Sequence, residues 1–121
     1  SPLPLLNSTT AWYDWHGDQL VATAPTTGAD VARLASDALP DAEWRHAVVW
    51  VARVGHLSRK YGDLAVRLAH LDAGVAMTHA ALVAVTLGSP PRMAASWRSA
   101  PLVELLDLSP DTDTVTGIML L

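Results

Sequence analysis

The stretch RKYGDLAVRLAHLDAGVAMTHAALVAVTLG, residues 59–88, decides the fold of this chain. Its apolar residues recur at intervals of three and four, which predicts one long helix from Asp63 to Leu87. The recurring residues are Leu64, Leu68, Leu71, Val75, Leu82 and Val85. Gly88 is in place to end this helix, and Gly74 predicts a kink or a close packing contact within it. Because the apolar run at its end is too short to span a bilayer, we predict a core helix and no membrane partner.

Strands are expected before and after this helix in the sequence. Residues 10–25, TAWYDWHGDQLVATAP, alternate aromatic and polar types around a glycine turn, which predicts a hairpin over 11–24. Residues 46–54, HAVVWVARV, are rich in β-branched and aromatic types, which predicts a buried strand covered on both faces. RMAASW, residues 92–97, and TVTGIMLL, residues 114–121, are the remaining predicted strands.

Two short helices complete the prediction. Thr26 or Thr27 is expected to cap a helix in GADVARLASDAL, which Pro40 ends. The apolar face of that helix consists of Val31, Leu34, Ala35 and Ala38. Ser99 is expected to cap APLVELLDL, with Pro101 in the first turn, where its missing N–H is not needed. The order of elements predicts an α+β fold, a mixed sheet with helices packed on it and one long central helix.

Length and composition limit the remaining possibilities. The chain has 121 residues, so we expect a single domain over 1–121, with an extended leader over 1–10. Half of the residues are hydrophobic and 17% are charged, as in well-packed globular proteins. The net charge of −4 and the lack of a basic run argue against nucleic acid as a partner. No signal sequence is recognisable, and we predict a cytoplasmic location.

The chain starts without methionine and stops in an apolar run, so we expect a piece of a longer or processed protein. It contains no cysteine, which excludes disulfides and thiolate chemistry. His70 and His79 are nine residues apart and project from nearly opposite sides of a helix, while His46 and His56 bracket a strand. We therefore expect no metal site. Neither a nucleophile elbow nor a phosphate-binding glycine loop occurs.

The adjacent pair Lys60 and Tyr61 is the strongest chemical candidate. A lysine near a phenol lowers the phenol's pKa, so the pair could act as a general base or bind developing negative charge. The alternative is a solvated lysine beside a half-buried tyrosine at the start of a helix, which is the more common arrangement of these residue types. The spacing alone does not distinguish the two.

The whole stretch over 59–88, followed by a loop, SW, LVELLDLSPDTD and GIMLL, resembles the C-terminal half of flavin-dependent nitroreductase-fold proteins. It is most similar to the SagB-type dehydrogenases, which oxidise peptide azolines to azoles, and the resemblance covers roughly residues 11 to 121. The resemblance implies a partial nitroreductase-like fold and FMN as cofactor. It assigns proton removal to Lys60 and Tyr61, and places the backbone of Ala94, Ala95 and Ser96 against the isoalloxazine ring.

The chain departs from that family at several positions. The family's arginine, histidine and Gln-Asn pair correspond to Leu64, Val75 and Thr78-His79 in this sequence. The family's N-terminal half, which binds the FMN phosphate, has no counterpart in this sequence, so FMN would require another chain or segment. Expected partners are a second nitroreductase-like chain or that missing half, with a cyclodehydratase and a peptide substrate. Three functions stay open. The first is an FMN-dependent, SagB-like azoline dehydrogenase component, and the second is a degenerate flavin-free subunit that is a scaffold or binds peptide in a biosynthetic complex. The third is a generic small α+β interaction domain whose likeness to the family is accidental.

Overall fold

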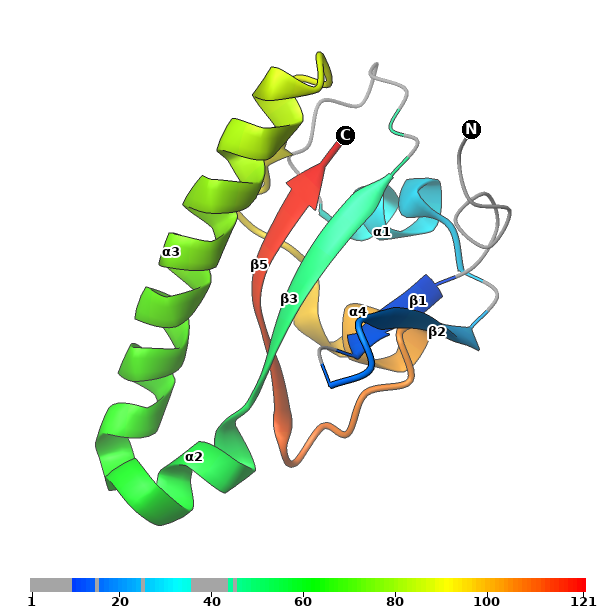
Figure 1. Ribbon diagram of the computed structural model, residues 1–121. Helices are drawn as coiled ribbons and strands as arrows, with labels where there is room; N and C mark the ends of the chain where they lie inside the picture. Colours follow the sequence, from blue (N-terminus) through cyan, green and yellow to red (C-terminus); the bar gives the residue numbers. More distant parts are fainter. Residues whose placement is uncertain (1–9, 15, 25, 36–43, 45) are drawn as a thin grey trace.

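The computed structural model describes residues 10–14, 16–24, 26–35, 44 and 46–121. Their elements form a two-stranded hairpin and a three-stranded antiparallel sheet with helices on both faces (Figure 1). The strands are β1 (Thr10–Asp14), β2 (Gln19–Ala24), β3 (Ala47–Arg53), β4 (Arg92–Met93) and β5 (Asp113–Leu120). The helices are α1 (Gly28–Leu34), α2 (Val54–Tyr61), the 3-10 turn η2 (Gly62–Leu64), α3 (Ala65–Thr86) and α4 (Ser99–Leu105). This arrangement confirms the predicted α+β class.

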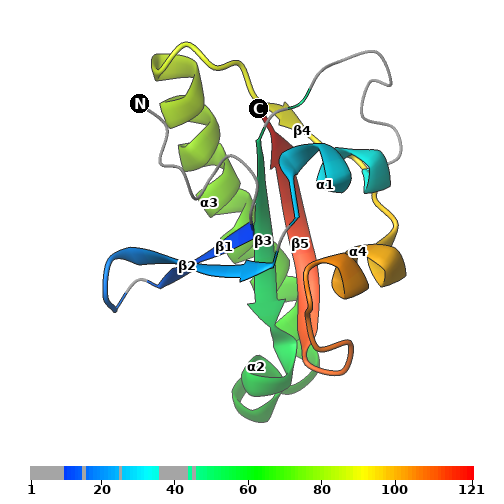
Figure 2. The ribbon, with the colours of Figure 1, turned by 90° about the vertical axis from the view of Figure 1, so that its right-hand side faces the viewer.

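The hairpin predicted over 11–24 is confirmed. β1 pairs antiparallel with β2, and Asp18 in the turn has a φ of 47°. The Tyr13 hydroxyl donates a hydrogen bond to Oδ1 of Asp18 at 2.8 Å, and this bond is the main cause of the raised pKa of Tyr13. The hairpin extends away from the sheet (Figure 2). The Arg53 guanidinium, 5.5 Å from the Trp12 ring centroid, links it to the end of β3. The leader predicted over 1–10 lies outside the described residues except for Thr10, which begins β1.

The three-stranded sheet has the order β3-β5-β4, so β5 is its central strand. β5 is buried from Val115 to Leu120, whereas no residue of β3 is fully buried. The prediction of a buried β3 is therefore wrong: β3 lies at the edge of the sheet among the described residues, and all of its residues remain at least partly exposed. β4 is also shorter than predicted: after Met93 the chain leaves the ladder, and Ala94 N–H donates to Ile118 O at 3.0 Å.

A β-bulge at Thr116 determines which β5 side chains share a face. Trp50 pairs with Gly117 and Val51 pairs with Val115, so Thr116 is the extra residue. Its hydroxyl donates to Trp50 O at 3.3 Å. Because one extra residue shifts the alternation, Val115 lies on the same side of the sheet as Ile118.

On one side of the sheet, α1 and α4 pack on β5 to form the large-residue core. Its buried members are Val31, Ala35, Leu102, Leu106, Val115, Ile118 and Leu120. Thr27 caps α1, as expected: its hydroxyl accepts from Asp30 N–H, and the Asp30 carboxylate accepts from Thr27 N–H. α1 ends at Leu34, and the predicted continuation to Ala38 and Pro40 falls outside the described residues.

The helix α4 lies where the sequence predicts it, but its N-cap residue is not the predicted one. Arg98 is the N-cap residue of α4, and no side chain caps the helix. Ser99 is already the first helical residue, which places Pro101 in the first turn. The prediction of a Ser99 cap is therefore wrong, because the extended residue that precedes the helix is Arg98.

The predicted long helix is present as α3, but a short helix that the sequence did not predict, α2, precedes it. α2 ends at Tyr61, and Gly62 adopts a φ of 57°, a conformation that favours glycine, before the chain enters α3. Lys60 and Tyr61 therefore end a separate short helix instead of beginning the long one. Gly88, which has a φ of 77°, follows the end of α3 as predicted. α3 lies along the side of the sheet opposite α1 and α4 (Figures 1 and 2).

The burial of α3 differs from the prediction of a core helix. Its buried residues are all alanine: Ala65, Ala69, Ala73 and Ala84. The Met77 side chain contacts Gly117 of β5 so closely that a Cβ on Gly117 would collide with the sulfur. Of the residues predicted to face the core, Leu71, Val75, Leu82 and Val85 are exposed instead, and Leu68 is half-buried. A Cβ on Gly74 would meet nothing within 4 Å, and α3 continues through this residue, so the predicted kink or close contact is absent.

Candidate functional site

Lys60 and Tyr61 lie together in the last turn of α2. The Lys60 ammonium is 5.3 Å from the centroid of the Tyr61 ring, within the range of a cation–π contact. Lys60 is exposed and Tyr61 is 42% exposed, and no described residue hydrogen-bonds the phenol. Both functional groups are therefore open to a molecule that approaches the junction of α2 and α3.

Ala94, Ala95 and Ser96 follow β4 in the loop that leads to α4. The amide of Ala94 is committed to Ile118 O, and Ala94 is half-buried against the large-residue core. Ala95 and Ser96 are exposed. Their small side chains leave the backbone accessible, so the part of this segment that could lie against a flat cofactor is Ala95 and Ser96.

The structure places these two groups at opposite ends of β5. The start of α2 is held at one end, where Gly55 N–H donates to Thr112 O at 3.4 Å. Ala94 is held six residues further along β5, at Ile118 O. Six residues of strand span about 20 Å, and Figure 2 shows α2 and β4 at opposite ends of the sheet. One chain therefore does not bring Lys60 and Tyr61 together with Ala94, Ala95 and Ser96.

The outer face of α3 is an apolar surface that the sequence analysis had placed in the core. We name it the outer seam, and it consists of Leu64, Leu68, Leu71, Val75, Leu82 and Val85. Leu71, Val75 and Leu82 are 62%, 61% and 63% exposed. The members are spaced alternately by four and three residues, with Thr78 at the one polar position, which is the spacing of a helix–helix seam. Such a surface is typical of association with another helix.

The stretch Val54–Thr86 is also long and apolar enough to cross a membrane, by length and composition only. This is weak evidence for a membrane span. The stretch is divided at Gly62, and the alanine face of α3 packs directly on β5. Packing within the chain therefore accounts for the alanine face, while the outer seam remains exposed.

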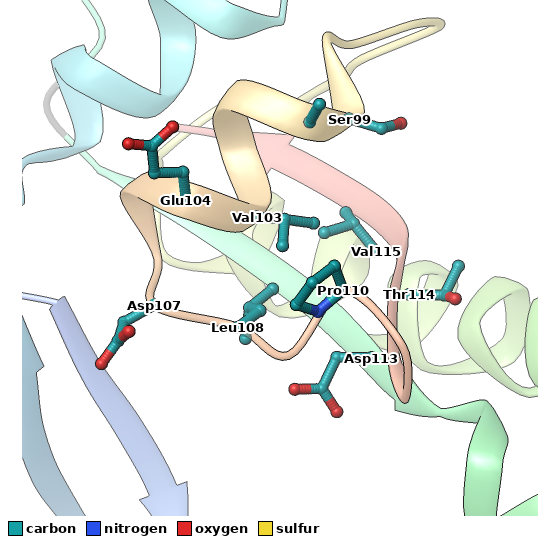
Figure 3. Close-up of a pocket in the computed structure, with 10 residues that line it drawn as sticks. Ser99, Val103, Glu104, Asp107, Leu108, Pro110, Asp113, Thr114 and Val115 are labelled. Carbon is teal, nitrogen blue, oxygen red and sulfur yellow. The ribbon is translucent and has the colours of Figure 1, made fainter.

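A second candidate site is a cavity of about 630 Å³ between α4, the loop after it and β5 (Figure 3). The sequence analysis missed it. The available signal was charge: residues 99–121 contain the acidic residues Glu104, Asp107, Asp111 and Asp113 and no lysine or arginine. In the described part of the chain, no group of three or more histidine and acidic side chains could hold a metal ion.

Comparison with known proteins supports the fold. No family model and no curated protein matches the sequence. Among solved structures, the chain is similar to one in the E. coli microcin synthetase McbBCD complex with truncated pro-MccB17 bound. The TM-score is 0.81 at 19% sequence identity, and the match covers 94% of this chain and 44% of that chain. The chain therefore has the fold of part of that chain and spans less than half of its length, in agreement with the predicted partial, nitroreductase-like α+β fold.

Proposed function

We propose that this chain forms one wall of the flavin cleft of an FMN-dependent oxidoreductase that oxidises azolines to azoles in a ribosomally made peptide. The main observation behind the proposal is that one chain holds Lys60 and Tyr61 far from Ala95 and Ser96, so a cleft that contains both groups needs a second chain. The exposed outer seam offers the surface on which that second chain can pack. The similar structure, a synthetase complex with a bound propeptide, supports a peptide substrate and partner subunits. A cyclodehydratase would be a natural further partner, because it supplies the azoline.

A second nitroreductase-like chain, packed antiparallel on the outer seam, would complete the cleft. α3 has 22 residues, and a helix of this length spans about 33 Å. Antiparallel packing would bring the Lys60 end of one chain beside the Ala95 end of the other. Another copy of this chain is suited to this role: Asp72 and His79 flank the seam on one side, so Asp72 of each copy would face His79 of the other.

In this proposal Lys60 and Tyr61 handle the proton that leaves the azoline carbon. Tyr61 would accept the proton, and Lys60, whose ammonium lies 5.3 Å from the centroid of the Tyr61 ring, would bind the negative charge that develops. FMN would supply the hydride acceptor, with the backbone of Ala95 and Ser96 against its ring. The Lys60–Tyr61 pair and the Ala95–Ser96 segment are both exposed on this chain. The second chain would therefore have to cover them to keep water out of the cleft.

The seam is tested by replacing two of its leucines. Leu71→Glu with Leu82→Glu would bury charge in the contact and weaken association by about a hundredfold, measured by sedimentation. The matched control is Leu87→Glu, because Leu87 is 77% exposed and follows α3 outside the seam. Unchanged association of the double variant would contradict the proposal.

The chemistry is tested on the chain purified with its partners. Bound flavin absorbs between about 370 and 450 nm through its own ring system. Lys60→Ala and Tyr61→Phe should slow oxidation of an azoline peptide while the absorbance is retained. A colourless assembly would rule out the dehydrogenase and leave the second function.

That second function is a flavin-free subunit that acts as a scaffold or binds peptide. One observation favours it: Leu64 and Val75, which replace the polar residues of the family, are both members of the outer seam. The two replacements enlarge the apolar association surface where the family has polar groups.

A further inference from the structure

The cavity between α4 and β5 has no part in the proposed cleft. Its apolar centre is formed by Val103, Leu108, Pro110 and Val115, which come from α4, the following loop and β5. Its volume of about 630 Å³ lies within the usual range for ligand sites. The outer seam lies on the other side of the sheet, so the cavity and the seam can be occupied independently.

Three carboxylates stand around this apolar centre (Figure 3): those of Glu104, Asp107 and Asp113. Asp113 already accepts a hydrogen bond from Ser109 N–H at 2.9 Å. Glu104 and Asp107 are exposed, and no described lysine or arginine is within ion-pair distance of either. The cavity therefore carries negative charge that the described part of the chain leaves unbalanced.

An apolar centre with carboxylates around it favours the side chain of a basic residue over a metal ion. The described residues form no group of three potential metal ligands, so the carboxylates are too dispersed to coordinate one ion. An arginine or lysine side chain fits better, because its aliphatic stem packs on apolar residues while its charged head remains at a polar rim. Hydrogen bonds between a guanidinium and carboxylates are among the strongest in proteins.

We propose that this cavity binds a basic segment of the peptide substrate, in which an arginine or lysine stands next to an apolar residue. The apolar side chain occupies the centre between Val103 and Pro110, and the basic head reaches Glu104 and Asp107. The proposal rests on the proposed function for the presence of a peptide substrate. It adds a site for holding the peptide at a distance from Lys60 and Tyr61.

The test uses a fluorescently labelled hexapeptide of alternating leucine and arginine, with the full chain and whatever partner co-purifies. The matched probe replaces arginine by citrulline, which keeps the shape and removes the charge. Fluorescence anisotropy should show about tenfold tighter binding of the arginine peptide. Raising the salt from about 0.05 to 0.5 M should remove most of this difference, because the rim is exposed. Equal binding of the two peptides would overturn the proposal.

Variants assign the binding to the cavity. Glu104→Gln with Asp107→Asn should weaken binding of the arginine peptide about tenfold. Asp111→Asn is the matched control, since it removes a charge from the same loop but does not line the cavity, and it should change binding less than about twofold. Ala100→Trp, which places a large ring at an exposed position of the lining, should weaken binding of both peptides. Equal effects of Asp111→Asn and the double variant would show a general charge effect and overturn the site.

Sedimentation and flavin absorbance on the same samples separate this proposal from the previous one. The cavity variants should leave association and absorbance unchanged. Loss of peptide binding with both intact supports the cavity as the peptide site. If the unmodified protein neither associates nor contains bound flavin, the proposed function is contradicted, whether or not the protein binds the peptide.

Discussion

The two sides of the β3-β5-β4 sheet are packed by opposite means. On the α1 and α4 side, large aliphatic residues such as Leu102 and Ile118 are fully buried. On the α3 side, alanines and Gly117 bring helix and strand close together, and the valines of α3, with Leu71 and Leu82, are exposed. The first side has the packing of an interior, and the second leaves apolar area for another molecule. The burial of leucine in this chain therefore depends on the side of the sheet, which the following substitutions test.

A matched pair of leucines gives the largest expected difference. Leu102 in α4 is 0% exposed, and Leu82 in α3 is 63% exposed. Leu102→Ala should lower the free energy of unfolding by about 3 kcal/mol, because it opens a cavity in a close-packed core. Leu82→Ala should lower it by less than about 0.5 kcal/mol in the unassociated chain. Urea denaturation at low protein concentration measures both, and similar losses would contradict the difference between the two sides.

Replacing either of two glycines on the α3 side by alanine should change the free energy of unfolding in opposite directions. Gly117→Ala should cost about 2 kcal/mol, because the new methyl group collides with the Met77 side chain. Gly74→Ala should instead stabilise the chain by about 0.5 to 1 kcal/mol, since it meets nothing within 4 Å and lies inside a helix. Thermal and urea unfolding of the two variants measures this. A stabilising Gly117→Ala would show that α3 does not approach β5 this closely.

Loss of the cap of α1 should cost less stability than Leu102→Ala or Gly117→Ala. Thr27→Ala should cost about 1 kcal/mol through loss of the hydroxyl cap. The pKa of Asp30 lies below its ordinary value of 3.8, first because its carboxylate accepts the Thr27 N–H and then because it accepts the hydroxyl hydrogen bond. A lowered folded-state pKa contributes stability above the unfolded-state pKa, and this contribution is lost as the pH falls through the folded-state value. Asp30→Asn should remove this acid-dependent part, measured by urea unfolding below about pH 4.

Local signals predicted most of the fold. The hairpin, the strands β3 and β5, and the helix end at Gly88 follow from alternation and glycine chemistry, and the structure confirms them. The orientation of α3 was not predictable in the same way. Leucine and alanine both count as apolar, so periodicity alone does not say which face packs inward. The short helix α2 was also missed, because it has only 8 residues and periodicity does not identify a helix in so short a segment.

The candidate site was less predictable than the fold. Adjacency in sequence was sufficient to pair Lys60 with Tyr61, and the structure confirms their contact. The distance from this pair to Ala95 depends on where each segment meets β5, which is a property of the strand register. The cavity beside α4 depends on the path of the loop after that helix, although its acidic residues were visible in the sequence.

The position of β3 at the edge of the sheet has a practical consequence for handling the protein. In the described part of the chain, the strand Ala47–Arg53 pairs only with β5, so its other row of amides and carbonyls is open to a neighbouring strand. Val48, which is 38% exposed, adds apolar surface to this edge. An unpaired strand of this kind is a template for aggregation. Measurements on the unassociated chain should therefore be made at low protein concentration, where pairing between two such edges is least favoured.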